Sequence, residues 1–286
     1  WLATDNAGVR RRGVREQAAF PVPAEASALP GTAVYALAED AAGVIWAGTD
    51  SGFARFQNGN WETPVAAYRL PRPVVTHLLA QDETLWIGTP GGLAQYDSAA
   101  DRLLSEPLLM GQVVAAMAFD DQQSVWVATE SGGLWQRQRD GAWAERTPPG
   151  ADAAHPVHAL AADPTAPGAM LAAVQGAGLF RWSNGQWQPR YAGVALLSEG
   201  VDLIFPDPQL DSLWVGSAGS LYRVDEVGWS RYDNEDGMPG GAIRTIVRDT
   251  GSGGLWFGGS KGLTYFRDET TRPYVTIGGL AGAGVA

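Results

Sequence analysis

Between residues 33 and 66, short apolar runs alternate with turn residues at intervals that suit four strands. AVYALAED, VIWAGT, FARFQ and WETPV are the expected first, second, third and fourth strands, and FARFQ alternates apolar with polar positions. The separating segments AAG, DSG and NGN contain the Gly and Asn residues that tight turns require, because these residues adopt positive φ angles. This order predicts one antiparallel, four-stranded sheet.

A phrase around the second strand recurs seven times along the chain. It runs apolar, Trp, apolar, small, Thr or Ser, a turn with Gly, and apolar again. The copies are WLATDNAGV at Trp1, IWAGTDSGF around Trp46, LWIGTPGGL around Trp86, VWVATESGGL around Trp126, MLAAVQGAGL around Leu171, LWVGSAGSL around Trp214 and LWFGGSKGL around Trp256. A period in the low forties is typical of β-propellers. We therefore expect an all-β, seven-bladed β-propeller with four-stranded antiparallel blades.

The propeller is expected to occupy residues 1–277. The first copy starts at a second strand, so its blade lacks a first strand. The tail 278–286 either supplies this closing strand or begins a following domain. Because the chain starts at Trp1 within a repeat, we expect it to be a piece of a longer protein, with any signal peptide or membrane anchor outside it.

Composition narrows the classes of partner. A net charge of −11 argues against a nucleic-acid partner and against direct contact with an anionic membrane surface. The absence of Cys excludes disulfides, thiolate metal sites and cysteine nucleophiles. No apolar run approaches the roughly 18 residues that span a bilayer. We expect no cofactor.

Acidic residues end the six complete first strands in register. Such a series resembles a metal site, but calcium needs six to eight oxygens gathered in one place, and these residues fall in separate turns. We interpret them instead as turn residues whose carboxylates accept backbone hydrogen bonds, and expect no metal site. They are Asp40, Asp82, Asp120, Asp163, Asp207 and Asp249.

The Trp and Thr of the phrase also have structural interpretations. Leu171 replaces the Trp in one copy, so the second-strand Trp is expected to pack between neighbouring blades. The hydroxyls of Thr4, Thr49, Thr89, Thr129 and Ser217 are expected to cap turn backbone, and their repetition argues against use as nucleophiles. By contrast, Trp61 in a fourth strand is expected near a blade rim.

One position of the first strand differs between repeats and is mostly polar. Aligning the strands on their terminal Asp brings together Tyr35, His77, Ala115, His158, Asp202 and Arg244. One such residue from each blade would line the central channel and could orient a small polar ligand. Arg72 and His155, in loops before first strands, and Asp50, Ser51, Glu130 and Lys261, in turns after second strands, would form the rim. Alternatively, these are variable residues of a water-lined channel.

The phrase LWIGTPGGLAQYD and the segment 231–266, in which D-G-M-P precedes a first strand, resemble the repeats of two-component regulator propellers. These are sensor ectodomains of bacterial membrane-bound hybrid histidine kinases. The resemblance implies a non-catalytic sensing module in the periplasm or outside the cell, anchored through its parent protein. The copy in residues 151–190 departs from the pattern because it lacks the Trp and the Thr.

A weaker similarity links the chain to streptogramin lyases, seven-bladed propellers with a related W-x-T phrase. It implies a lyase or hydrolase that would use His77 or His158 with Asp202, although no pairing motif places the histidines as the base of that family. A third alternative is a structural propeller that docks a protein on its rim. We expect no catalytic residues and keep three possible partners: a small polar ligand, a glycan or a protein.

Overall fold

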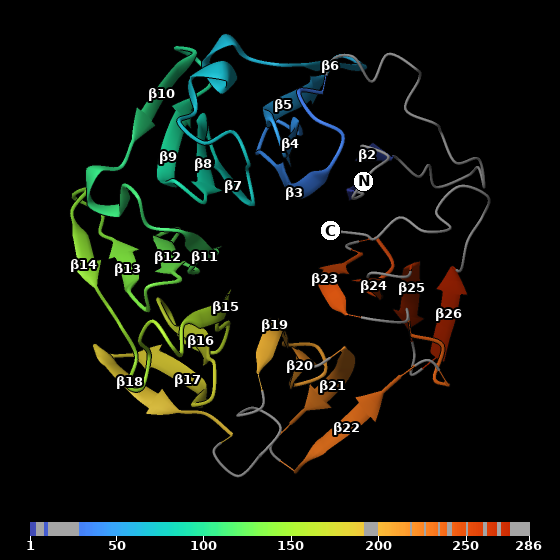
Figure 1. The fold of residues 1–286 in the computed structure, drawn as a ribbon. Coiled ribbons are helices and arrows are strands. Elements are labelled where there is room, and N and C mark those ends of the chain that lie inside the picture. Colours follow the sequence, from blue (N-terminus) through green and yellow to red (C-terminus); the bar gives the residue numbers. More distant parts are fainter. Residues whose placement is uncertain are drawn as a thin grey trace. The chain divides into compact units, whose positions relative to one another are not determined.

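The structure, a computed structural model, describes residues 1–3, 9–10, 29–191, 200–217, 219–225, 227–233, 235–238, 242–249, 251–259, 262–267 and 270–274. This part of the chain forms six four-stranded antiparallel sheets, each with its strands in sequence order, and one two-stranded sheet (Figure 1). Residues 1–114 and 115–276 fall into two compact units. We call each four-stranded sheet a blade and name it by its strands.

The first unit contains the two-stranded sheet and two blades. The two-stranded sheet is β1 (Leu2–Ala3) and β2 (Val9–Arg10). The blades are β3 (Val34–Glu39), β4 (Ile45–Thr49), β5 (Gly52–Gln57) and β6 (Asn60–Glu62), and β7 (His77–Gln81), β8 (Thr84–Thr89), β9 (Gly92–Asp97) and β10 (Arg102–Ser105). Each is followed by a short 3-10 helix, η2 (Val65–Arg69) and η3 (Pro107–Leu109).

The second unit contains four blades. The first two are β11 (Val114–Phe119), β12 (Val125–Thr129), β13 (Leu134–Arg137) and β14 (Trp143–Glu145), and β15 (Val157–Ala162), β16 (Met170–Val174), β17 (Gly178–Ser183) and β18 (Gln186–Pro189). The last two are β19 (Val201–Asp207), β20 (Ser212–Ser217), β21 (Ser220–Val224) and β22 (Trp229–Tyr232), and β23 (Ile243–Arg248), β24 (Leu255–Gly259), β25 (Gly262–Arg267) and β26 (Thr270–Tyr274).

The prediction of seven blades is wrong: the described residues form six. The first copy of the phrase makes only the hairpin β1–β2, in which Leu2 pairs with Arg10 and Ala3 with Val9. The phrase marks a second strand, so counting phrases does not count complete blades. The proposed closing tail, 278–286, lies outside the described residues.

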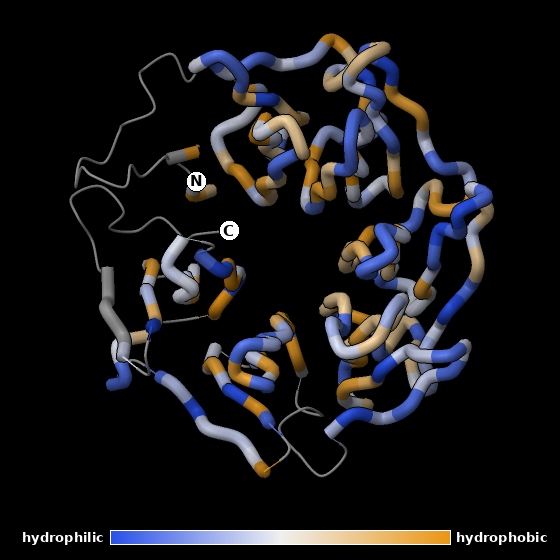
Figure 2. Tube along the Cα trace, turned by 180° about the vertical axis from the view of Figure 1, so that it is seen from behind, coloured by the Kyte–Doolittle hydropathy of each residue, from blue (hydrophilic) through white to orange (hydrophobic). Residues whose placement is uncertain are grey.

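Second strands form the buried layer of each blade. All five residues of β4, β12 and β16 are buried, as are the six of β20. Apolar side chains from neighbouring blades meet around them, as where Trp46 packs edge-on against Tyr96 of the next blade, with ring centroids 5.7 Å apart. Along the other strands, hydrophobic and hydrophilic positions are interleaved (Figure 2). The core is therefore distributed over the repeats.

Glycine in the turn after the second strand is required by packing as well as by φ. Gly92 has a φ of +125°, and a Cβ placed on it would lie 2.4 Å from the Leu109 carbonyl oxygen. A Cβ on Gly132, with a φ of +94°, would lie 2.3 Å from the carbonyl carbon of Asp152. In both places the loop that leaves the next fourth strand rests on the turn. The repeated Gly therefore makes room for the segment that connects its own blade to the next one.

The prediction for the repeated hydroxyl is confirmed in three blades. The Oγ1 atoms of Thr49 and Thr89 each donate to the carbonyl of the glycine three residues later, at 2.9 Å, and Thr129 Oγ1 donates to Gly133 at 3.3 Å. Ser217 differs, because its hydroxyl donates to the Gly200 carbonyl at 2.7 Å. Thr4 lies outside the described residues.

Fourth-strand tryptophans do not share one environment. Trp229 is 53% exposed, as a rim residue would be, whereas Trp61 is 8% exposed. Trp61 packs against Phe56 and Trp1, with ring centroids 5.3 and 6.0 Å apart. The expectation that Trp61 lies near a rim is therefore wrong.

No helix in the described ranges has the length and apolar character needed to cross a bilayer.

Candidate functional site

The aspartates that end the first strands are embedded in their own blades. Asp120 is 2% exposed, and its Oδ1 accepts hydrogen bonds from the backbone N–H groups of Gln122 and Ser124 at 3.0 and 2.8 Å. Its Oδ2 accepts from Nε1 of Trp126 at 3.0 Å. One carboxylate thus fixes the turn between the first two strands and anchors the repeated Trp. The sequence predicted the first role and not the second.

The same contact recurs in two other blades. Asp40 Oδ1 binds two turn N–H groups, and its Oδ2 accepts from Trp46 Nε1 at 3.1 Å. Asp207 Oδ1 likewise accepts from the turn, while its Oδ2 accepts from Trp214 Nε1 at 3.3 Å. We call this arrangement the Asp–Trp clasp. The indole N–H of the repeated Trp therefore donates a hydrogen bond to the carboxylate, in addition to the packing of its ring.

The blade β15–β18 keeps the carboxylate although it has lost the Trp. Leu171 stands at the Trp position, and Arg181 lies directly opposite it on β17. The Arg181 guanidinium donates to Asp163 Oδ2 and to Thr165 Oγ1, and so replaces the missing indole donor. Burial alone would raise the pKa of Asp163, but hydrogen bonds from Thr165 and Arg181 outweigh it, so the pKa lies below its usual value.

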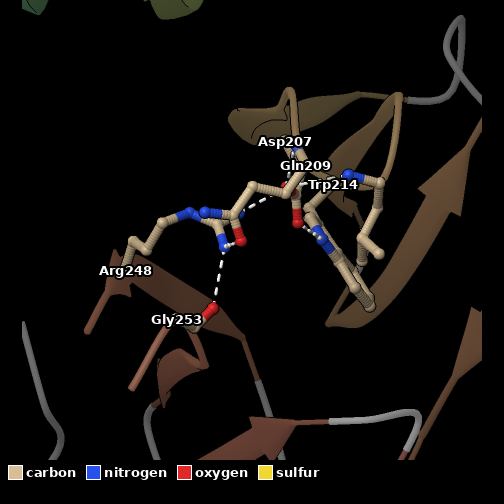
Figure 3. Close-up of polar contacts among 6 residues, drawn as sticks. Asp207, Gln209, Trp214, Arg248 and Gly253 are labelled. Atoms are coloured by element: carbon tan, nitrogen blue, oxygen red, sulfur yellow. Dashed lines mark hydrogen bonds and ion pairs between the residues drawn. The ribbon is translucent and has the colours of Figure 1, made fainter. Parts of the chain in front are cut away.

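Asp207 additionally joins two blades (Figure 3). The guanidinium of Arg248, at the end of β23, forms an ion pair with the buried Asp207 carboxylate. It also donates to Gln209 Oε1 at 2.7 Å and to the Gly253 carbonyl at 2.9 Å. These contacts leave the carboxylate engaged with protein donors. Consistently, the described ranges contain no group of three or more acidic, His or Cys residues placed to hold a metal.

In four of the six described blades, the variable polar position of the first strand coincides with a β-bulge. In β3, β15, β19 and β23 the pairing register shifts at one residue, which is left without a partner on the second strand. Those residues are Tyr35, His158, Asp202 and Arg244. A bulge re-aims a side chain and is frequent beside functional sites. The repeats therefore combine conserved geometry with variable chemistry at this position.

The bulge residues are exposed, whereas the residue before each is buried. Within the second unit, β15 contacts β19, and β19 contacts β23, so His158, Asp202 and Arg244 come from adjacent strands. In the first unit, Tyr35 is 40% exposed and His77 is half-buried at the start of β7, which contacts β3. Each unit thus presents its own set of these side chains.

Local contacts set the chemistry of the histidines at this position. His158 Nε2 lies 3.1 Å from Gln175 Oε1, in the turn after the second strand of the same blade. With the amide oxygen accepting, Nε2 carries the proton and Nδ1 is left as an acceptor. His77 Nδ1 lies 2.9 Å from the Thr76 hydroxyl. Among the described residues, Asp202 forms no hydrogen bond or ion pair with His158, although the two come from adjacent strands.

The loop at 151–156 holds a carboxylate–imidazole pair. Asp152 Oδ1 accepts from His155 Nδ1 at 3.0 Å and from the N–H groups of Ala154 and His155, each at 2.8 Å. These hydrogen bonds, first that of Ala154 and then that of the ring, hold the pKa of Asp152 below its usual value. The D-x-x-H spacing in a loop was the available sequence signal, and it was missed.

Other rim candidates occupy separate turns. Arg72 is exposed and rests on the turn of its own blade, where a Cβ on Gly91 would lie 3.1 Å from the Arg72 Cγ. Glu130 is exposed, and Asp50 is half-buried and accepts from the Ser51 hydroxyl at 3.3 Å. Lys261 lies outside the described residues.

Comparison with known proteins supports the resemblance seen in the sequence. The family described as two component regulator propeller matches residues 28–51. Comparison with curated proteins gives no significant match.

Among solved structures, the chain is similar to the extracellular domains of two hybrid two-component systems from B. thetaiotaomicron. For BT3049, the identity is 19% and the TM-score 0.69, over 87% of this chain and 35% of the other. For BT4673, the identity is 17% and the TM-score 0.66, over 96% and 35%. A streptogramin B lyase is 15% identical with a TM-score of 0.62, over 89% and 86%.

These similarities establish the class of fold, which is an all-β propeller of four-stranded blades. The chain spans about a third of the length of each two-component ectodomain it matches. One fold of this kind supports unrelated activities, so the function has to be argued from the site.

Proposed function

We propose that this chain is a non-catalytic recognition module of a bacterial signalling protein, which binds a small polar ligand or a glycan through the bulge residues of its first strands. The observation that carries the proposal is the bulge at Tyr35, His158, Asp202 and Arg244. Packing alone gives no reason to break the ladder at one repeated position and to place a different exposed side chain there each time.

The bulge chemistry suits a ligand rich in hydroxyl or carboxylate groups. Arg244 supplies a cation, Asp202 a carboxylate, and His158 a ring nitrogen that accepts a hydrogen bond. Such donors and acceptors on adjacent strands can read the orientation of a polar molecule. The two-component ectodomains with this fold lie outside the cell, which supports a periplasmic or extracellular location in a membrane-anchored parent protein.

The experiment is a thermal-shift screen of sugars, oligosaccharides and small organic acids, followed by titration of each hit. A ligand at 100 times its dissociation constant adds roughly 2.7 kcal/mol to the free energy of unfolding. Arg244→Ala and His158→Ala should each weaken binding by more than about 1 kcal/mol, because each removes a charged or hydrogen-bonding partner. Arg231→Ala, which truncates an exposed arginine on β22, is the matched control.

Two outcomes would reject the proposal. If no compound binds, the docking of a protein on the rim becomes the better explanation. Equal weakening of a hit by Arg231→Ala and Arg244→Ala would place the site away from the bulges.

A lyase activity is the second candidate, and the Asp152–His155 pair favours it. The carboxylate orients the imidazole so that Nε2 can accept a proton, which is the arrangement of a general base. Turnover of a streptogramin B antibiotic that is lost in His155→Ala and weakened in Asp152→Asn would support catalysis. Turnover that survives both changes would exclude this pair from the chemistry.

A further inference from the structure

A shallow recess, open to solvent, lies between the blades β15–β18 and β19–β22. It is formed by the turns after the first strands and by the chain after β18, whereas the Gln175 turn beside His158 follows a second strand. Leu171, Leu213 and Pro206 give it apolar walls. The recess is therefore separate from the bulge residues in both its elements and its chemistry.

Two buried carboxylates line the recess but are already engaged. Asp163 accepts from Thr165 and pairs with Arg181. Asp207 accepts from Trp214 and pairs with Arg248. Each carboxylate is balanced by its own guanidinium, so neither supplies a free charge to a ligand.

Two charged side chains of the recess remain available, and a third polar group, the Ser212 hydroxyl, lies buried beneath it. Arg190 lies over the Tyr191 ring, with its guanidinium carbon 4.6 Å from the ring centroid, and Asp211 is exposed. Neither residue forms an ion pair with any part of the chain that the structure describes. Ser212 is 8% exposed, and its hydroxyl is buried without a hydrogen-bond partner among the described residues. A buried hydroxyl of this kind is costly unless something binds it.

Backbone geometry holds both sides of the recess in unusual conformations. Tyr191 and Asp211 have φ angles of +55° and +46°, in the left-handed region that residues other than Gly rarely adopt. For a bulky residue such as Tyr191 this conformation is uncommon, and it is frequent where a functional group must be presented.

We infer that the recess binds a small zwitterion, a free α-amino acid with a short apolar side chain. The Arg190 guanidinium would take the carboxylate, Asp211 would take the ammonium group, and the half-buried Pro206 would contact the side chain. A single cation and a single anion, each without an ion-pair partner in the described chain, match the two charges of this ligand class.

The test is isothermal titration of the purified chain with L-alanine and L-leucine, alongside propionate and isopropylamine, which each lack one of the two charges. At least one amino acid should bind with one-to-one stoichiometry, and the singly charged analogues should bind about tenfold more weakly or worse. Arg190→Gln and Asp211→Asn should each weaken the amino acid by a similar factor. Asn tolerates a positive φ, so Asp211→Asn preserves the turn.

Controls separate this site from the bulge site. Arg231→Gln, and the variants Arg244→Ala and His158→Ala, should leave amino-acid affinity unchanged. An unchanged melting temperature without ligand shows that each variant is folded. The inference is overturned if neither amino acid binds at millimolar concentration, or if binding persists in both Arg190→Gln and Asp211→Asn.

Discussion

Replacing Asp120 by Asn tests the Asp–Trp clasp directly. The side chain keeps its size, and Oδ1 still accepts from Gln122 and Ser124, but an amide Nδ2 now faces the indole N–H of Trp126. The change removes a charge-assisted hydrogen bond of 3.0 Å and leaves a buried donor unsatisfied beside a Trp with no exposed surface. A hydrogen bond to a charged group contributes about 1.5–3 kcal/mol, and an unsatisfied buried donor costs about 1–3 kcal/mol. We therefore expect Asp120→Asn to lower the free energy of unfolding by about 2–4 kcal/mol.

A double-mutant cycle isolates the contact. Trp126→Phe removes the donor while keeping an aromatic ring, so Asp120→Asn should cost about 1.5–3 kcal/mol less in that background. The assay is urea denaturation followed by far-UV circular dichroism, because the tryptophan signal itself changes. A coupling energy below about 0.5 kcal/mol would show that the indole and the carboxylate act independently.

The blade β15–β18 provides an internal control for this cycle. Leu171 has no donor, so Asp163→Asn combined with Leu171→Met should be additive within about 0.5 kcal/mol. Coupling of the same size in both blades would indicate a general packing effect instead of the hydrogen bond.

Three further predictions follow from burial and from the pKa directions. Burial and the nearby Asp101 raise the pKa of Tyr96 to about 12, so absorbance at 295 nm should show one tyrosine ionising near that value, and Tyr96→Phe should remove it. The stabilisation linked to Tyr96 is complete below pH 10 and is lost as the pH rises through about 12. The pKa of Asp163 is lowered, so its contribution is present above the unfolded pKa and is lost as the pH falls through the folded pKa; Asp163→Asn should flatten the acid limb of stability against pH. Finally, Trp61→Ala should cost about 3–5 kcal/mol, as for other buried aromatic residues, whereas Trp229→Ala should cost much less; equal losses in urea titrations would contradict their different burial.

Sequence patterning predicted the strands of the six blades because each strand is encoded locally. Apolar runs, turn residues and the terminal Asp lie within a few residues of one another, so the order of strands in a blade could be read directly. The number of blades could not, because the phrase identifies a second strand and says nothing of whether three others accompany it. Among the described residues, β1 and β2 carry the phrase without the further strands of a blade.

The equivalent positions of the candidate site could be aligned from the sequence, but their geometry could not be predicted. Alignment on the terminal Asp identified Tyr35, His158, Asp202 and Arg244 as equivalent and variable. Their bulges depend on the hydrogen-bond register with the next strand, which the order of side chains does not reveal. Contacts across a blade, such as that of His158 with Gln175, could not be predicted from the sequence either, because the partners are 17 residues apart.

The exchange of Trp for Arg in the blade β15–β18 has a consequence for how such repeats diverge. The carboxylate of Asp163 needs a donor, and the donor can come from either of two strands that face each other within the blade. Losing the indole at Leu171 is tolerable once a cation stands opposite it, at Arg181. Leu171 and Arg181 lie within one repeat, so the sequence of a single blade can change at these positions without compensating substitutions in its neighbours. Arg also faces the Trp in two blades that keep it, Arg55 opposite Trp46 and Arg223 opposite Trp214, so a substitute donor is present there before any loss of the indole. A search for the phrase alone will overlook blades that, like β15–β18, use the Arg.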